Sequence, residues 1–207
     1  MYKVPLISNP VSYDIKKSRF IGLTQHLSRM EQFHELMAQT KSDWPGATHY
    51  VWAYRLPNGI DKASDDGEPH GTAGLPLLNL LSHRNLYHTV LTVVRYFGGI
   101  KLGHGGLVHA YQKVGQLALD STTWGILVPA LDVQITVPYH TYNMVKNVLD
   151  NQTTNFHAVF DTEVTLSFRV IESQSNALFN RIQQITAGAA QLKLLNPIWD
   201  IMDNPTS

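Results

Sequence analysis

The twelve residues from Arg95 to Gly106 include the residue types that bind anions. Five of these residues are glycines: Gly98, Gly99, Gly103, Gly105 and Gly106. Glycine permits positive φ and leaves the backbone amides unshielded, so successive N–H groups can converge on one anion. Residues with helical spacing follow, and the first amides of a helix lack partners at the positive end of its dipole. With Arg95 and Lys101 adding positive charge, phosphate is the ligand that this run favours.

The known nucleotide motifs do not fit this run. Residues 98–103 have the glycine spacing of a P-loop, but His104 stands where that motif requires lysine. Val108 stands where the third glycine of a dinucleotide-binding fingerprint belongs. The glycines could equally serve only to let a strand and a helix pack closely. The run therefore predicts an anion site or a structural turn, and not an ATP or dinucleotide site.

A second group of polar residues forms an acidic cluster at Asp65, Asp66 and Glu68. Carboxylate oxygens could bind magnesium or calcium, although the spacing is not that of an EF-hand. The alternative is a solvated turn leading into a helix that Thr72 caps. If this cluster lies beside the glycine run, a metal-assisted hydrolase or phosphotransferase acting on a phosphorylated substrate becomes possible. We assign no metal ligand, cofactor or catalytic residue, because neither HExxH nor GxSxG occurs.

The composition limits the class of protein. The chain has 207 residues, 43% of them apolar, and sixteen basic residues balance sixteen acidic ones. This balance excludes nucleic-acid binding by bulk charge and leaves a local basic patch possible. The absence of cysteine excludes disulfides, thiolate zinc sites and cysteine nucleophiles. The N-terminus lacks the features of a signal peptide, and no apolar run approaches the roughly 18 residues that span a bilayer, so we expect a cytoplasmic protein with no membrane contact.

Residue periodicity predicts an α+β protein with two domains, residues 1–128 and 129–207. In the first domain we expect strands at 11–16, 20–26, 47–56 and 88–97, a polar loop at 57–71, and helices after Ser28, from Thr72 to Leu81 and after Gly106. Ser28 and Glu31 fit a capping box. Tyr50, Trp52 and Tyr54 share one strand face. Together with Tyr96 and Phe97 these aromatic residues could form part of a core or stack on single-stranded RNA bases.

The second domain has a different pattern. Strands are expected at 133–137, 156–160, 164–171 and 191–195, with helices at 139–149 and around 177–185. The order βαββαβ matches the ferredoxin-like unit.

Four stretches of this sequence resemble the signatures of the YigZ/IMPACT family: residues 16–21, 47–49, 64–74 and 93–108. The resemblance implies an N-terminal domain with the fold of the second domain of a small-subunit ribosomal protein. It implies a C-terminal domain similar to the ferredoxin-like domains of an elongation factor. Eukaryotic relatives regulate translation by blocking activation of the amino-acid-starvation kinase.

From the residues and this resemblance together we expect a non-enzymatic regulator of translation or of a stress response. It would bind RNA, the ribosome or a translation-machinery protein through the glycine-rich run. The resemblance gives the acidic cluster, Arg95, Lys101 and the glycines as site candidates. His70, His104 and His109 replace residues that are commonly small or basic in the family, and histidine is mostly neutral at pH 7, which predicts a weaker positive patch.

Overall fold

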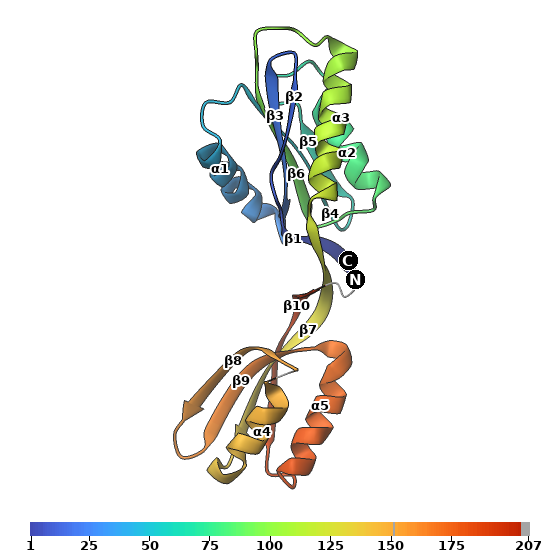
Figure 1. Ribbon diagram of the computed structural model, residues 1–207. Coiled ribbons are helices and arrows are strands. Elements are labelled where there is room, and N and C mark those ends of the chain that lie inside the picture. Colours follow the sequence, from blue (N-terminus) through green and yellow to red (C-terminus); the bar gives the residue numbers. More distant parts are fainter. Residues whose placement is uncertain (151, 204–207) are drawn as a thin grey trace. The chain divides into compact units, whose positions relative to one another are not determined.

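The computed structural model describes residues 1–150 and 152–203, which form two compact units (Figure 1). One unit contains Tyr2–Ile126, and the other contains Met1 with Leu127–Met202. Each unit combines one sheet with α-helices, which confirms the α+β class. No helix within the described residues is both long and apolar enough to cross a lipid bilayer.

The sheet of the first unit is antiparallel throughout, in the order β2-β3-β6-β4-β5. Its strands are β2 (Val11–Ile15), β3 (Ser18–His26), β4 (His49–Leu56), β5 (Ile60–Ser64) and β6 (Thr89–Tyr96). The central strand β6 is buried from Thr89 to Arg95, as its β-branched run predicts. The expectation of a loop over residues 57–71 is wrong for β5, whose polar and mostly exposed residues pair with β4 at the edge of the sheet.

Helices cover both faces of this sheet. On one face α2 (Gly74–His83) and α3 (His104–Asp120) pack with the sheet into the largest buried apolar cluster. On the other face lies α1 (Phe33–Asp43), preceded by a short 3-10 helix, Met30–Gln32. Figure 1 shows α1 on the opposite side of the strands from α2 and α3.

The aromatic face of β4 is covered by α1. The rings of Trp52 and Tyr54 stack at 5.6 Å, and the ring of Phe33 lies 4.5 Å from that of Trp52 and 5.0 Å from that of Tyr54. The Tyr50 hydroxyl donates a hydrogen bond to the carbonyl oxygen of Trp44. Tyr54 is buried, and Tyr50 and Trp52 are half-buried. These contacts favour packing against α1 over a base-stacking platform.

The two helix caps predicted for this unit are also wrong. The side chain of Gln32, and not that of Glu31, accepts a hydrogen bond from the backbone N–H of Ser28. The Thr72 hydroxyl donates to the carbonyl oxygen of Pro69. The first amides of α2 instead donate to a carboxylate from the acidic cluster, which no local spacing rule indicates.

The second unit confirms the ferredoxin-like prediction. Its elements are β7 (Thr123–Val137), a 3-10 turn (Tyr139–Thr141), α4 (Tyr142–Leu149), β8 (Thr154–Phe160), β9 (Val164–Ile171), α5 (Glu172–Ile185) and β10 (Gln191–Asp203). The strand order is β10-β7-β9-β8, and β1 (Tyr2–Ile7) also pairs with β7. Alternate residues of β9 are buried, and α4 and α5 share one apolar cluster with them.

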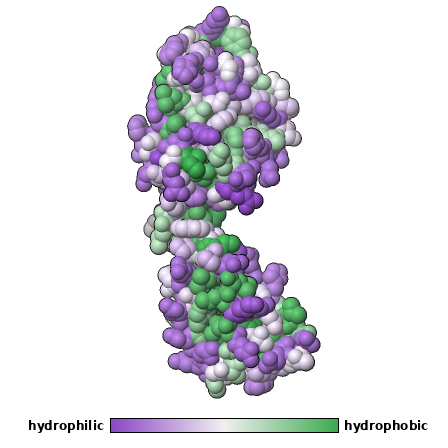
Figure 2. Space-filling model, turned by 180° about the vertical axis from the view of Figure 1, so that it is seen from behind, coloured by the Kyte–Doolittle hydropathy of each residue, from purple (hydrophilic) through white to green (hydrophobic). Residues whose placement is uncertain are grey.

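Both helices of the second unit therefore pack on the same face of its sheet. Seen from the opposite side, this unit carries a gathering of apolar residues (Figure 2). Exposed large apolar side chains of the unit include Val159, Leu194 and Leu195.

Candidate anion-binding site

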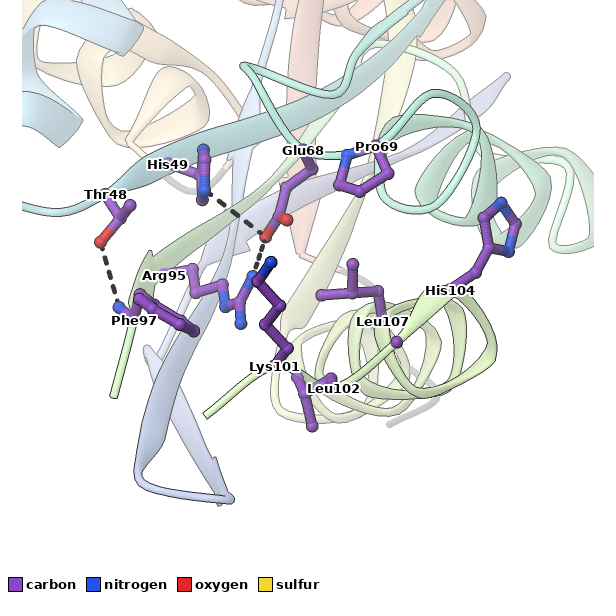
Figure 3. A pocket seen from close by; sticks show the side chains of 11 residues that line it. Thr48, His49, Glu68, Pro69, Arg95, Phe97, Lys101, Leu102, His104 and Leu107 are labelled. Carbon is purple, nitrogen blue, oxygen red and sulfur yellow. Dashed lines mark hydrogen bonds and ion pairs between the residues drawn. The ribbon is translucent and has the colours of Figure 1, made fainter. Parts of the chain in front are cut away.

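A pocket of about 350 Å³ in the first unit joins the two motifs that the sequence singled out (Figure 3). Its walls come from the start of β4, the turn before α2, the end of β6 and the start of α3. The lining residues are Thr48, His49, Glu68, Pro69, Arg95, Phe97, Lys101, Leu102, Gly103, His104 and Leu107. The glycine run and the acidic cluster are thus neighbours in space.

The pairing of strands in the sheet positions Arg95 in this pocket. Arg95 on β6 is the direct partner of Phe20 on β3 and of His49 on β4. Facing residues on adjacent strands lie within side-chain contact of each other. The Arg95 guanidinium lies 5.1 Å from the Phe20 ring centre and 5.3 Å from that of Phe97. The guanidinium thus lies within cation–π distance of two aromatic rings.

Arg95 is a paired charge, and not the free cation that the sequence suggested. It is only 4% exposed, and its Nη1 donates to Oε1 of Glu68. Its Nη2 donates to the Ser18 hydroxyl at 3.3 Å, while the buried Nε has no acceptor among the described residues. A buried charge is stable only when a partner compensates it. Arg95 and Glu68 therefore contribute little net charge to the pocket.

Glu68 is the centre of a buried hydrogen-bond network. Its Oε1 also accepts a hydrogen bond from the Tyr111 hydroxyl at 2.7 Å, and His49 Nε2 lies 3.9 Å away. Burial, followed by the charge of Glu68, raises the pKa of Tyr111, so this hydroxyl remains a donor. His49 Nδ1 donates to the carbonyl oxygen of Asp66 at 2.7 Å, which directs Nε2 toward Glu68 (Figure 3).

The two aspartates of the acidic cluster accept hydrogen bonds from backbone N–H groups. The Asp65 carboxylate accepts hydrogen bonds from the N–H groups of Gly71, Ala73 and Gly74, and so caps α2. Burial alone would raise the pKa of Asp65, but these three hydrogen bonds outweigh it and lower the pKa. Asp66 accepts from the backbone N–H of Tyr50 at 2.6 Å.

These contacts bear on the metal hypothesis for the acidic cluster. Within residues 1–150 and 152–203, no group of three or more His, Asp or Glu side chains is arranged to hold a metal ion. At least one oxygen of each carboxylate accepts a hydrogen bond from an amide, an arginine or a tyrosine.

The backbone of residues 98–106, here called the glycine loop, keeps most of its amides unpaired. The Phe97 N–H donates to the Thr48 hydroxyl, and the Gly98 N–H donates to the Ser18 hydroxyl. The next amide that pairs is Leu107, which donates to Gly103 at the start of α3. Between them, the N–H groups of residues 99–106 form no hydrogen bond with any described part of the chain.

Gly103 turns the chain into α3. Its φ of +75° and ψ of 167° lie in a region that only glycine occupies readily. The helix it begins is 17 residues long and has no acidic residue in its first turn, so the positive end of its dipole is not offset there. Lys101 is exposed, makes no ion pair with a described residue and extends toward the pocket in Figure 3.

The structure divides the candidate residues into groups. Glu68, Arg95, Lys101 and Gly103 line the pocket, whereas Asp65 and Asp66 support its walls. Gly98, Gly99, Gly105 and Gly106 shape the glycine loop without lining the pocket. From the sequence, Phe97 was a candidate only for base stacking, and Thr48 and His49 were known only as part of a strand and of residues 47–49. Only the pairing of β4 with β6 brings these residues to the site.

Comparisons with known proteins cover nearly the whole chain. A family model described as the Impact N-terminal domain matches residues 16–119. An IMPACT family member of Haemophilus influenzae is 33% identical over 94% of this chain and 97% of its own length. The IMPACT family member YvyE of Bacillus subtilis is 34% identical over 86% of this chain and 84% of its own. The crystal structure of a hypothetical protein aligns over 94% of this chain and 97% of that one, with 28% identity and a TM-score of 0.64.

Proposed function

The chain belongs to the IMPACT family, and from this premise we propose that it is a non-enzymatic regulator of translation or of a stress response. It acts by contacting RNA, the ribosome or a translation-machinery protein through the glycine loop and Lys101. The observation that carries the proposal is the run of amides at residues 99–106 beside Lys101, none of which has a hydrogen-bond or acidic partner among the described residues. Such a surface binds phosphate oxygens.

The contacts of the acidic cluster do not favour a metal-assisted hydrolase or phosphotransferase. It requires carboxylates that are free to hold a metal or to exchange protons beside the bound phosphate. Asp65 and Asp66 accept hydrogen bonds from backbone amides, and Glu68 is held by Arg95 and Tyr111. These contacts support a structural role for the cluster.

The charge of Lys101 is tested by a salt series. Binding of a single-stranded RNA to the unmodified chain is expected to weaken with salt, with a slope of log K against log salt near −0.7 for each neutralised phosphate. Lys101→Ala should weaken binding and make this slope shallower by about 0.7. Lys62→Ala, on the edge strand β5 and outside the pocket, is the matched control. Ribosome co-sedimentation over the same salt series extends the measurement, and equal slopes for both variants would contradict the role of Lys101.

The contribution of the backbone is tested at His104. His104→Pro removes the first amide N–H of α3 at a position where proline fits a helix, and the extended ψ of Gly103 suits a residue before proline. His104→Ala removes the imidazole and keeps the N–H, so it is the control. We expect the proline variant to bind RNA about tenfold more weakly than the alanine variant, as loss of a hydrogen bond to a charged group implies. Equal affinities, with both variants folded by circular dichroism, would exclude this amide from the site.

A further inference from the structure

The pocket beside the glycine loop has a polar side and an apolar side. Lys101, Gly103 and His104, with the unpaired amides of this part of the glycine loop, form the polar side. Pro69, Phe97, Leu102 and Leu107 contribute the apolar lining. A volume of about 350 Å³ falls in the range of small-molecule sites, and at about 30 Å³ for each water it holds roughly a dozen of them. An inorganic phosphate would leave most of this space to water.

The polar side suits a terminal phosphate better than an internal one. A phosphomonoester carries close to two negative charges at pH 7 and presents three acceptor oxygens. The glycine loop has several unpaired donors, and Lys101 adds a full positive charge to the partial charge of the helix end. An internal phosphodiester has a single charge and fewer free oxygens, so it would use fewer of these donors.

Arg95 adds hydrogen-bond donors to the pocket without adding net charge, because Glu68 neutralises it. It lines the pocket while only 4% exposed, and its guanidinium has five N–H donors. The described residues accept from its Nη1 and Nη2, and its Nε has no acceptor. Buried donors without an acceptor are uncommon in folded proteins. Glu68 accepts one N–H of Nη1 and Ser18 accepts one N–H of Nη2, so one N–H on each of these nitrogens remains, whereas Nε is shielded from solvent.

The apolar side suits a nucleobase. Phe97 is 43% exposed although it lines the pocket, and an aromatic ring can stack on any base. Nearby, Oε2 of Glu68 accepts no hydrogen bond from the described residues, and His49 Nε2 faces the same side of the pocket (Figure 3). Nucleobases have N–H donors that such acceptors can bind.

From these observations we propose that the pocket binds one nucleotide with a terminal phosphate, held by the glycine loop, with its base against Phe97. This inference rests on the proposed function and narrows the ligand of the same site. The nucleotide is either a free nucleoside monophosphate or the phosphorylated end of an RNA strand, because both present the same chemistry.

The two sources are distinguished by titrating the full chain with five kinds of probe. These are inorganic phosphate, the ribonucleoside 5′-monophosphates, and one short RNA prepared with a 5′-phosphate, with a 3′-phosphate or with hydroxyls at both ends. We expect the monophosphates to bind more tightly than inorganic phosphate and to compete with a phosphorylated RNA end. RNA with two hydroxyl ends should bind at least tenfold more weakly than its phosphorylated counterpart. Equal binding of all three RNAs, without competition by monophosphates, would overturn the inference and leave the proposed function standing.

The remaining outcomes separate the two proposals. Monophosphate binding in the absence of RNA and ribosome binding would support the inference and overturn RNA recognition. Monophosphate affinity no greater than that of inorganic phosphate would overturn the role of the base. If no probe and no ribosome binds, both proposals fail together.

Variants of Phe97 test the position of the base. Phe97→Leu removes the ring and keeps an apolar side chain, and should weaken monophosphate binding about tenfold without changing the affinity for inorganic phosphate. Phe97→Tyr keeps the ring and should bind like the unmodified chain. Equal losses for phosphate and monophosphate in Phe97→Leu would indicate that the ring only supports Arg95, and would contradict the proposed stacking.

Discussion

At the scale of single residues, the site is organised around a carboxylate that is not free. Glu68 is 8% exposed and accepts hydrogen bonds from Arg95 and Tyr111 through one oxygen. Removing one donor from a buried charge costs more free energy than the hydrogen bond contributes when both partners are present. Glu68 and Arg95 are therefore held in place by their own contacts. Lys101 and the backbone amides of the glycine loop are the groups that can bind a ligand.

Tyr111→Phe tests this network. The variant removes the hydroxyl from a fully buried side chain and leaves the Glu68 carboxylate with one donor fewer. The free energy of unfolding should fall by about 1.5–3 kcal/mol, the range for hydrogen bonds to charged groups. Urea unfolding measures it. Tyr142→Phe in α4 is the control and should change stability by less than about 0.5 kcal/mol, since no hydrogen bond of its hydroxyl is found within the described residues. If Tyr111→Phe also lowered the free energy of unfolding by less than about 0.5 kcal/mol, this result would contradict a stabilising role for the network.

At the scale of elements, two glycines of the same loop have different reasons to be glycine. A Cβ on Gly98 would lie 2.0 Å from the carbonyl oxygen of Lys17, so the end of β6 passes too close to the β2–β3 turn for any side chain. A Cβ on Gly105 would meet no atom within 4 Å, and the residue lies in the first turn of α3. Packing requires glycine at position 98. Glycine at position 105 instead leaves the N-terminus of α3 without a side chain over it.

Alanine at these two positions should therefore have opposite effects on stability. Gly98→Ala forces the backbones apart and should lower the free energy of unfolding by about 1–3 kcal/mol. Gly105→Ala should raise it by up to about 1 kcal/mol, because alanine has the higher helix propensity. Chemical denaturation of both variants measures the difference. Destabilisation by Gly105→Ala would mean that this position is more crowded than the structure indicates.

At the scale of the whole molecule, two histidines of the first unit predict how stability depends on pH. Burial, followed by the charge of His88, lowers the pKa of His26, and burial lowers the pKa of His88 despite its backbone hydrogen bonds. Both folded-state pKa values lie below the unfolded value near 6.5, so below pH 6.5 the unfolded chain binds more protons. The free energy of unfolding should then decrease as the pH falls from about 6.5 through the folded pKa values.

Urea unfolding between pH 7.5 and 4.5 measures this slope. His26→Gln and His88→Asn should each make it shallower, and asparagine tolerates the positive φ of residue 88. His140→Gln, in the second unit, is the control and should leave the slope unchanged. An unchanged slope in the two test variants would assign the acid sensitivity to other groups.

Features that depend on neighbouring residues along the chain could be predicted from the sequence. Alternating apolar residues in β9 and the βαββαβ order were sufficient for the ferredoxin-like unit, because strand burial has a period of two. The glycine loop was found in the same way, since the glycines are adjacent and a helix follows them. The ends of helices and strands were predicted less accurately than their order. Strand β5 was not predicted because an edge strand needs no apolar pattern.

The roles of the candidate side chains depend on contacts between distant parts of the chain. Arg95 and Glu68 neutralise one another across 27 positions of sequence, and Asp65 caps a helix that begins nine residues later. His49 reaches the pocket through the register of β4 with β6. Such pairings depend on strand register and on where each loop packs against the sheet. Local periodicity contains no information about either.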